Sequence, residues 1–138
     1  AASDHLSTHY TPATTIAEEF TREGLLEAMK KRHSYGATDN IILDYRLQDG
    51  DREYLQGDIV EAGRRFRLWI KVIGTAPVQQ IDIIRNNSFL HTRQSPGAHV
   101  EFTYADAEVK PGENYYYVRV QQADGQIAWS SPIWVTVK

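Results

Sequence analysis

The segment between residues 113 and 137 constrains the fold more strongly than any other part of the chain. In its first half, every second position holds an apolar residue, namely Tyr116, Val118 and Val120. This alternation predicts a strand with one buried face and one wetter face. Residues 123–125, Ala-Asp-Gly, then reverse the chain, and aromatic and β-branched residues resume after them. The segment therefore predicts a hairpin, and Pro132 predicts a kink or an edge position in its second strand.

A β pattern extends over the whole chain after residue 40. It is strongest in residues 64–73, and the pair Asn86-Asn87 is typical of a two-residue hairpin turn. Seven or eight short strands with turns between them predict a mainly β protein, an antiparallel β-sandwich of the immunoglobulin-like type. We expect the residues on the apolar side of each strand to form the core. They are Phe66, Leu68, Ile70, Val72, Phe102, Tyr116, Val118 and Val120.

One helix is predicted before this sandwich, at about residues 22–34. Thr21 is a suitable N-cap residue, basic residues crowd the last turn, and Gly36 supplies a stop signal. The apolar stripe of this helix is narrow and consists of Leu25, Leu26, Ala28 and Met29. Because such a stripe does not stabilise an isolated helix, we expect the helix to dock, either on the end of the sheet or on a neighbouring domain.

Composition limits the classes of partner and chemistry. The 138 residues carry a formal net charge of -3 and include no cysteine, so we expect no nucleic-acid partner, no disulfide and no cysteine nucleophile. No apolar run approaches the ~20 residues of a membrane span. Arg65, Arg67 and Lys71 flank Trp69 in a pattern that also occurs in single-strand nucleic-acid platforms. Alternation on a half-exposed strand produces the same pattern, and the net charge favours that interpretation.

Candidate metal ligands lie close together at the start of the chain. Asp4, His5 and His9 combine one carboxylate with two imidazoles, a set that suits Zn, Mn or Fe. A catalytic metal needs three or more convergent ligands, and the remaining histidines are scattered along the chain. These residues therefore predict either one edge of a metal site or a solvated polar terminus. For the chain in isolation we favour the terminus, loosely docked over about residues 1–20.

Residues 111–120, Pro-Gly-Glu-Asn-Tyr-Tyr-Tyr-Val-Arg-Val, are followed by Ala-Asp-Gly and Ser-Ser-Pro. This succession resembles the last two strands of fibronectin type III domains, in which a Pro-Gly turn leads into a strand with a tyrosine corner. The resemblance implies a tyrosine corner in this chain too. Either Tyr115 or Tyr116 could make it, and Tyr116 is the one that shares the parity of the apolar residues.

A second resemblance covers nearly the whole chain. Residues 2–9, 22–43, 74–77 and 115–135 are similar to the C-terminal part of a large, mostly uncharacterised bacterial family. Its members carry a catalytic-type domain similar to the PHP (polymerase and histidinol phosphatase) metal-dependent hydrolases. The resemblance implies that this chain is a C-terminal part of such a protein, and that its partner is an upstream catalytic domain of the same polypeptide.

The same resemblance implies a division of the chain and a role for its first residues. Residues 1–39 would be the tail of the upstream hydrolase-type domain, and residues 40–138 would be the β-sandwich domain. Asp4, with His5 or His9, would belong to the last metal-binding motif of the upstream domain, which would hold Zn or Mn. The 138-residue chain itself would hold no complete catalytic site.

Three functions are compatible with these features. The first is a non-catalytic β-sandwich module that packs beside the catalytic domain of a longer protein. The second is a stand-alone module that binds a sugar or a protein through exposed Trp69, Trp129 or Trp134. The third is a small metalloenzyme, which would have to take its metal shell, its general base and its pocket from one short terminal segment.

Overall fold

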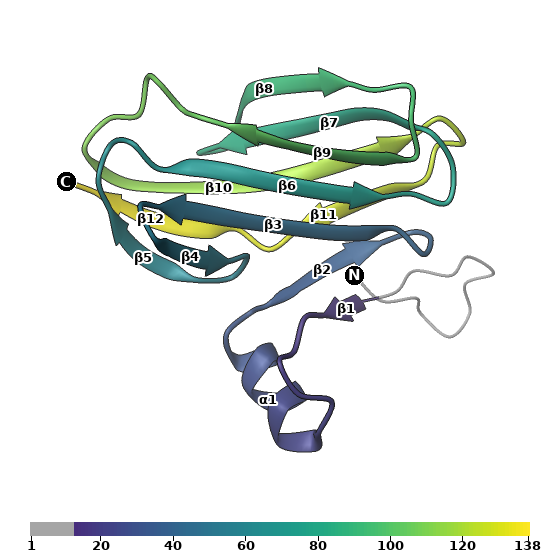
Figure 1. Ribbon diagram of the computed structural model, residues 1–138, viewed down its shortest axis with the longest axis horizontal. Coiled ribbons are helices and arrows are strands. Elements are labelled where there is room, and N and C mark those ends of the chain that lie inside the picture. Colours follow the sequence, from purple (N-terminus) through teal and green to yellow (C-terminus); the bar gives the residue numbers. More distant parts are fainter. Residues whose placement is uncertain (1–12) are drawn as a thin grey trace.

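The computed structural model describes residues 13–138 and shows a β-sandwich with one helix (Figure 1). Seven strands have five residues or more: β3 (Ile42–Asp49), β6 (Arg67–Ile73), β7 (Val78–Arg85), β8 (Ser88–Gln94), β9 (His99–Tyr104), β10 (Gly112–Gln122) and β12 (Ile133–Val137). Five strands are shorter: β1 (Ala13–Thr15), β2 (Ser34–Ala37), β4 (Arg52–Leu55), β5 (Ile59–Ala62) and β11 (Ile127–Ser130). Helix α1 (Arg22–Lys30) lies between β1 and β2 in the chain.

The strands form two sheets that enclose one core. The four-stranded sheet has the order β4-β3-β6-β9. In the eight-stranded sheet, β10 pairs with β7 along one edge and with β11 and β12 along the other; β8 lies beyond β7. Strands β2 and β5 lie beyond β11 and β12, and β1 lies beyond β2. All pairs are antiparallel except β5 with β12.

The seven longer strands have the arrangement expected of an immunoglobulin-like sandwich. Strands β3, β6 and β9 form one layer, and β8, β7, β10 and β12 form the other, so the chain changes sheets between β6 and β7 and again on either side of β9. This is the layer order of the fibronectin type III kind. The predicted fold class is therefore confirmed. The total of twelve strands in residues 13–138 exceeds seven or eight because short strands extend both sheets.

The predicted kink at Pro132 is confirmed. Residues 131 and 132 divide the last strand into β11 and β12, which both pair with β10. At this break the hydroxyl of Ser130 accepts a hydrogen bond of 2.9 Å from the backbone N–H of Val118, because the ladder between β10 and the last strand is interrupted there. The N–H of Val118, at the centre of β10, therefore has an acceptor in spite of the break.

The core has the composition that the alternation predicts. Seven of the eight predicted core residues are at most 2% exposed. Phe102 packs against the same core but is only partly buried, because β9 is the last strand of its sheet. On β6 the intervening residues Arg67, Trp69 and Lys71 face outward. The register of the sheet is therefore the predicted one.

Tyr116 takes the position of the tyrosine corner, but its hydroxyl bonds a side chain instead of the backbone. Its side chain is fully buried, and its hydroxyl donates a hydrogen bond of 2.7 Å to Asp106 in the connection between β9 and β10. Asp106 also pairs with Arg85 at 2.6 Å and accepts a hydrogen bond from the backbone N–H of Glu108. Burial and the hydrogen bond to Asp106 raise the pKa of Tyr116 well above its usual range, so the phenol remains a donor. Tyr115 points to the opposite face of the sheet.

The part of the chain before residue 40 contributes to the sandwich. Strand β2 pairs with β11, and Ala37 is fully buried in the core. Strand β1 pairs with β2, and Ile16 packs against the core, so residues 13–16 are more firmly docked than expected. The region predicted as a tail thus supplies two strands to the eight-stranded sheet.

Helix α1 begins where predicted but ends earlier. The side chain of Thr21 caps the N-terminus by accepting a hydrogen bond from the N–H of Gly24. The helix ends at Lys30, not near residue 34, and Gly36 lies inside β2. Arg32 adopts the left-handed conformation with φ 61°, and the N–H groups of Arg32 and His33 return to the carbonyls of Met29 and Ala28. This is a Schellman motif with arginine in the position that glycine usually takes.

Candidate functional site

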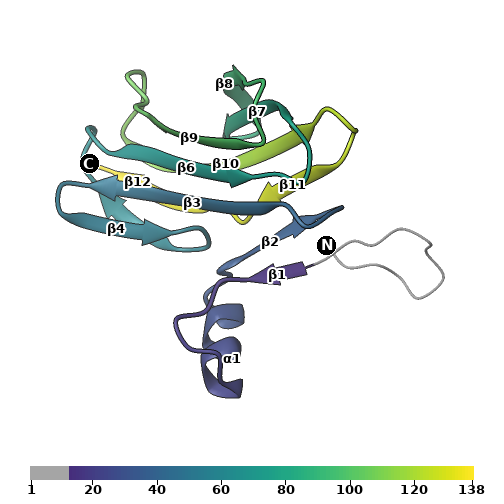
Figure 2. The ribbon, with the colours of Figure 1, turned by 45° about the vertical axis from the view of Figure 1, so that its right-hand side comes forward.

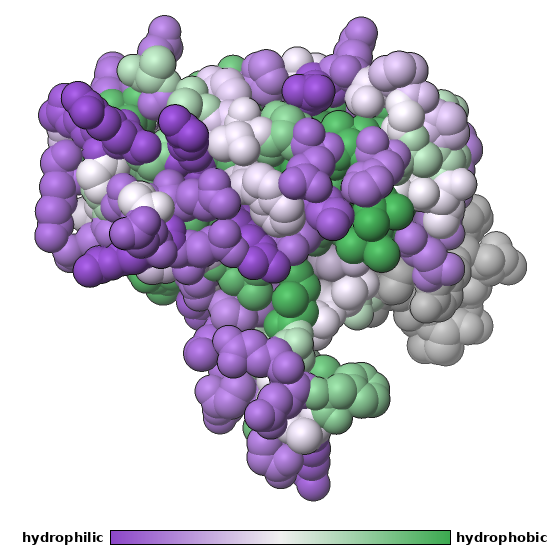
Figure 3. All heavy atoms as spheres, in the orientation of Figure 1, coloured by the Kyte–Doolittle hydropathy of each residue, from purple (hydrophilic) through white to green (hydrophobic). Residues whose placement is uncertain are grey.

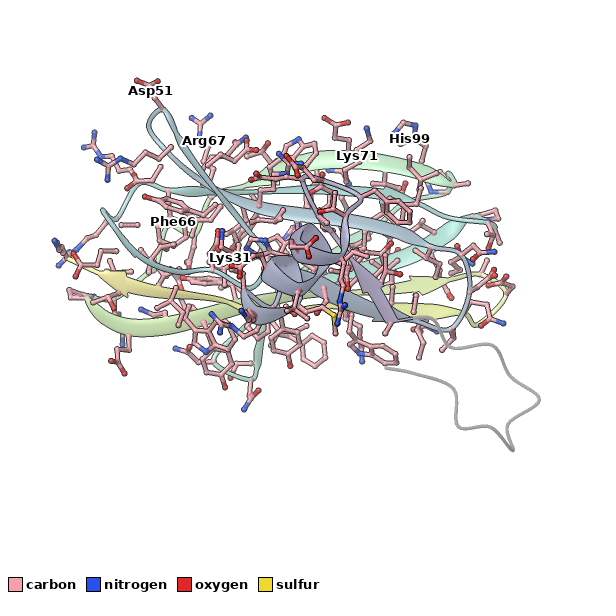
Figure 4. All side chains as sticks on the ribbon, turned by 90° about the horizontal axis from the view of Figure 1, so that it is seen from below. Lys31, Asp51, Phe66, Arg67, Lys71 and His99 are labelled. Carbon is pink, nitrogen blue, oxygen red and sulfur yellow. The ribbon has the colours of Figure 1, made fainter. Side chains whose placement is uncertain are left out.

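The outer face of the four-stranded sheet is polar. Arg46 forms hydrogen bonds with Asp44 and Glu53, and the ring N–H of Trp69 donates to Glu101 at 3.1 Å. Lys71 lies between acidic residues of both neighbouring strands in the register. Figure 3 shows hydrophilic side chains over most of this face, and Figure 4 shows Arg67, Lys71 and His99 pointing outward from it while Phe66 lies between the sheets. This face has the features of an ordinary solvated surface.

The outer face of the eight-stranded sheet is aromatic. We call this set the aromatic face: Phe89, Tyr115, Tyr117, Trp129 and Trp134. Its members come from strands β8, β10, β11 and β12 of one sheet. Phe89 is 63% exposed and Trp129 is 37% exposed. The two outer faces of one sandwich therefore differ in chemistry, although both are produced by strand alternation.

An ion pair with a buried carboxylate lies in the aromatic face. Asp82 lies on this outer side of β7, yet it is only 1% exposed. It accepts hydrogen bonds from Arg119 at 2.7 and 3.0 Å, and from the side chains of Gln80 and Thr92. The guanidinium of Arg119 also lies over the ring of Phe89, 5.2 Å from its centroid. Both carboxylate oxygens of Asp82 are thus bound by side chains of the sheet, and this cluster has a positioning role.

A hollow of about 550 Å³ opens at the other end of the aromatic face. Its floor is a row of cross-strand neighbours, Tyr115 on β10, Trp134 on β12 and Ile59 on β5. Arg32 covers one side of the floor, with its guanidinium 5.4 Å from the ring centroid of Trp134. Polar residues on the rim are Asn86, Glu113 and Thr136. A concave apolar floor with a few polar groups around it is typical of a binding site.

Helix α1 carries a second exposed apolar surface. The helix projects from the body of the sandwich (Figures 1 and 2). Of its side chains only Ala28 is buried, whereas Leu26 is 51% exposed and Met29 is 62% exposed. Arg32, two residues after the helix, lines the hollow and so connects the two surfaces. The sequence predicts that this helix docks, but among residues 13–138 nothing covers Leu26 and Met29.

The position of α1 depends on a close contact with Gly57. Gly57 has φ 103°, and a Cβ atom on it would lie 2.4 Å from the carbonyl oxygen of Arg32. The Gly57 carbonyl accepts a hydrogen bond of 3.1 Å from the Arg32 side chain, and the neighbouring Asp58 is 2.8 Å from the ring of His33. The end of the helix is therefore fixed to the β4–β5 connection by backbone packing and two polar contacts.

Replacing Gly57 with alanine is expected to destabilise the chain and to loosen the helix end. The left-handed backbone alone costs a non-glycine residue about 1 to 3 kcal/mol, and the clash with Arg32 adds to that cost. Urea unfolding measures the loss. Gly63→Ala is the matched control, because Gly63 has no positive φ and a Cβ atom added to it would meet no atom within 4 Å. Equal stability of the two variants would contradict the role of Gly57.

The structure separates the residues that the sequence suggested for a site. Trp129 and Trp134 lie together on the aromatic face, whereas Trp69 lies on the opposite, polar face. Asp4, His5 and His9 lie outside the described residues. Within residues 13–138 no group of three or more His, Asp or Glu side chains is placed to hold a metal ion. In the same residues no helix has the length and apolar character needed to cross a membrane.

Sequence reasoning missed three residues of the hollow. The alternation of the strand places Tyr115 on its solvent-facing side. The run of three tyrosines was the available signal that the outer face of this strand is aromatic. Ile59 reaches the hollow through the parallel pairing of β5 with β12, which no local pattern indicates. The predicted helix includes Arg32, so its left-handed conformation could not be expected.

Comparisons with known proteins give relatives of much greater length. The chain is 33% identical over 142 residues to an uncharacterised protein of Chlamydia trachomatis and 34% identical to one of Chlamydia muridarum; each match covers 91% of this chain and 23% of the relative. It is 32% identical to an uncharacterised protein of Chlamydia pneumoniae, with 96% of this chain and 24% of the relative covered. No family model matches the chain. No solved structure matches it either. The chain therefore spans about a quarter of the length of these bacterial relatives.

Proposed function

We propose that the chain is a non-catalytic β-sandwich module of a longer bacterial protein, in which it packs beside a PHP-like metal-dependent hydrolase domain of the same polypeptide. The observation that supports a packing role is the exposure of Leu26 and Met29 on α1, a helix that projects from the sandwich. A short helix with Leu26 and Met29 uncovered is stabilised by a neighbour, and the relatives are long enough to supply one.

The hydrolase part of this proposal depends on the first residues of the chain. Asp4, with His5 or His9, would complete a Zn or Mn site whose other ligands belong to the upstream domain. Carboxylate and imidazole suit these ions, and the metal would supply Lewis-acid activation of water and substrate. In this arrangement β1 and α1 connect the upstream domain to the sandwich, and the sandwich contributes no further metal ligand.

Two measurements on the longer polypeptide and on this chain test the proposal. The longer polypeptide is expected to hydrolyse p-nitrophenyl phosphate with Mn²⁺ or Zn²⁺, and the double variant Asp4→Ala, His5→Ala is expected to lose that activity. His99→Ala is the control, because His99 lies exposed on the polar face. The 138-residue chain alone is expected to bind Zn²⁺ in calorimetry no more tightly than a flexible peptide, because tight binding needs convergent ligands and an ordered second shell.

Two results would overturn this function. One is the absence of metal-dependent hydrolysis in the longer polypeptide with any of a panel of phosphoesters. The other is tight, stoichiometric Zn²⁺ binding by the 138-residue chain that the double variant abolishes, since this would support a small metalloenzyme instead.

A second candidate function is a stand-alone module that binds a sugar or a protein. It is favoured by the position of Trp134 on the floor of the hollow, beside Tyr115, and by Trp129 on the same face. Trp69, which lies on the polar face, would take no part in such a site. Titration of the chain with soluble oligosaccharides, with Trp134→Ala as the comparison, tests this candidate.

A further inference from the structure

We propose that the preceding domain of the longer polypeptide docks on two exposed apolar parts of the surface, Leu26 and Met29 of α1 and the hollow formed by Tyr115, Trp134 and Ile59, with Arg32 connecting the two. This inference rests on the proposed function and adds to it the residues of the interface. It requires that the domain be part of the same polypeptide, but not that the domain be a hydrolase.

The contrast between the two outer faces is the first argument. Both faces belong to one sandwich, and both follow the alternation of their strands. On the four-stranded sheet, outward positions hold Arg46, Lys71 and Glu101, which carry the charges of a solvated surface. On the eight-stranded sheet, outward positions of three neighbouring strands hold Tyr115, Trp134 and Ile59, and Ile59 is 71% exposed. An exposed patch of neighbouring apolar side chains is typical of an interaction site.

The composition of the surface is the second argument. Tyr, Trp and Arg are the residues most enriched among those that dominate the energy of protein–protein interfaces, and Met is enriched there too. The surface combines Tyr115, Trp134, Arg32 and Met29, and its hollow can accept an apolar side chain of the partner. Arg32 is fixed by its bond to the Gly57 carbonyl and by its contact with Trp134, so it presents a preformed group. This composition favours a protein occupant over a sugar.

The path of the chain identifies which protein occupies the surface. Ala13, at the start of β1, is the register partner of Gly36, and Gly36 is the register partner of Trp129. Two strand spacings, roughly 10 Å, therefore separate Ala13 from the aromatic face. After β1 the chain passes through α1 to Arg32, so the described N-terminal part runs along the proposed surface. A domain that precedes this chain in the longer polypeptide is therefore tethered beside the aromatic face, and the tether gives it a high effective concentration at surfaces close to that face.

Hydrogen exchange on the unmodified proteins tests the docking surface directly. Amide exchange in α1, β5 and β12 is expected to be slower by at least about tenfold in the longer polypeptide than in the 138-residue chain. Exchange in β3 and β9, on the polar sheet, is expected to be the same in both. Equal exchange in α1, β5 and β12 with and without the rest of the polypeptide would overturn the proposal.

A pair of variants provides the matched control. Ile59→Lys in the longer polypeptide is expected to remove the protection of α1 and β12, whereas Ile42→Lys, at a 52% exposed position on the polar face, is expected to leave it unchanged. Neither change is expected to alter the melting temperature of the 138-residue chain, because both side chains are exposed. If both variants change amide exchange equally, or if the protection persists in Ile59→Lys, the proposed docking surface is wrong. Slower amide exchange in a longer polypeptide that has no hydrolase activity would overturn only the hydrolase assignment. Hydrolase activity without slower amide exchange would overturn only the proposed docking surface.

Discussion

Replacing Asp106 with alanine is expected to lower the free energy of unfolding by about 3 to 5 kcal/mol, because the change leaves buried partners without their acceptor. The carboxylate is buried, and it binds the guanidinium of Arg85 and the hydroxyl of Tyr116. Without it, the Tyr116 hydroxyl keeps no acceptor in the core and the partly buried charge of Arg85 loses its counterion. Urea unfolding of the 138-residue chain measures the difference.

Two further variants separate the contributions to this cluster. Tyr116→Phe removes one hydrogen bond and leaves the ion pair in place, so we expect a loss of about 1 to 2 kcal/mol. Glu108→Ala should change stability by less than about 0.5 kcal/mol, because Glu108 contributes only its backbone N–H to Asp106 and its side chain is exposed. If Asp106→Ala costs no more than Tyr116→Phe, the ion pair with Arg85 contributes nothing and the proposed role of Asp106 is wrong.

The alternation of the longer strands was sufficient to predict the sandwich and its core. A strand such as β10 records its environment in its own sequence, because successive side chains meet the core and the solvent in turn. The turns could be predicted for the same local reason. Asn86 and Asn87 have φ values of 51° and 63°, which their short polar side chains tolerate and which the β7–β8 hairpin requires.

The elements that the sequence did not predict depend on distant partners. Strands β1 and β2 have three and four residues, too few to show a period, and they exist because β1 pairs with β2 and β2 pairs with β11. The early end of α1 has the same cause, because residues 34–37 gain a strand partner and Arg32 is fixed by Gly57. Local propensity favoured a longer helix, and tertiary pairing overrode it.

The candidate site could be predicted only in part. Parity placed Tyr115 on the wetter face, and the alternation of the last strands likewise places Trp129 and Trp134 outward. That Tyr115 and Trp134 meet Ile59 and Arg32 in one hollow follows from the sheet order, which brings residues 32, 59 and 134 together from three separate segments. The sequence thus identified residues that could bind a partner, and the topology supplied their combination.

The second large loss of stability is expected at Ile70, on the buried face of β6. Ile70 is fully buried between the sheets, and its register neighbours Tyr45 and Phe102 face the same core. Ile70→Ala is expected to cost about 2 to 5 kcal/mol, because it removes buried methyl groups and leaves a cavity that rigid strands cannot close.

Ile42→Ala makes the same chemical change on the outer face of the neighbouring strand, where the side chain is 52% exposed, and should cost less than about 1 kcal/mol. Thermal and urea unfolding of both variants measure the contrast. Because a register shift by one residue exchanges the faces of a strand, a larger loss for Ile42→Ala than for Ile70→Ala would show that the four-stranded sheet pairs in a different register.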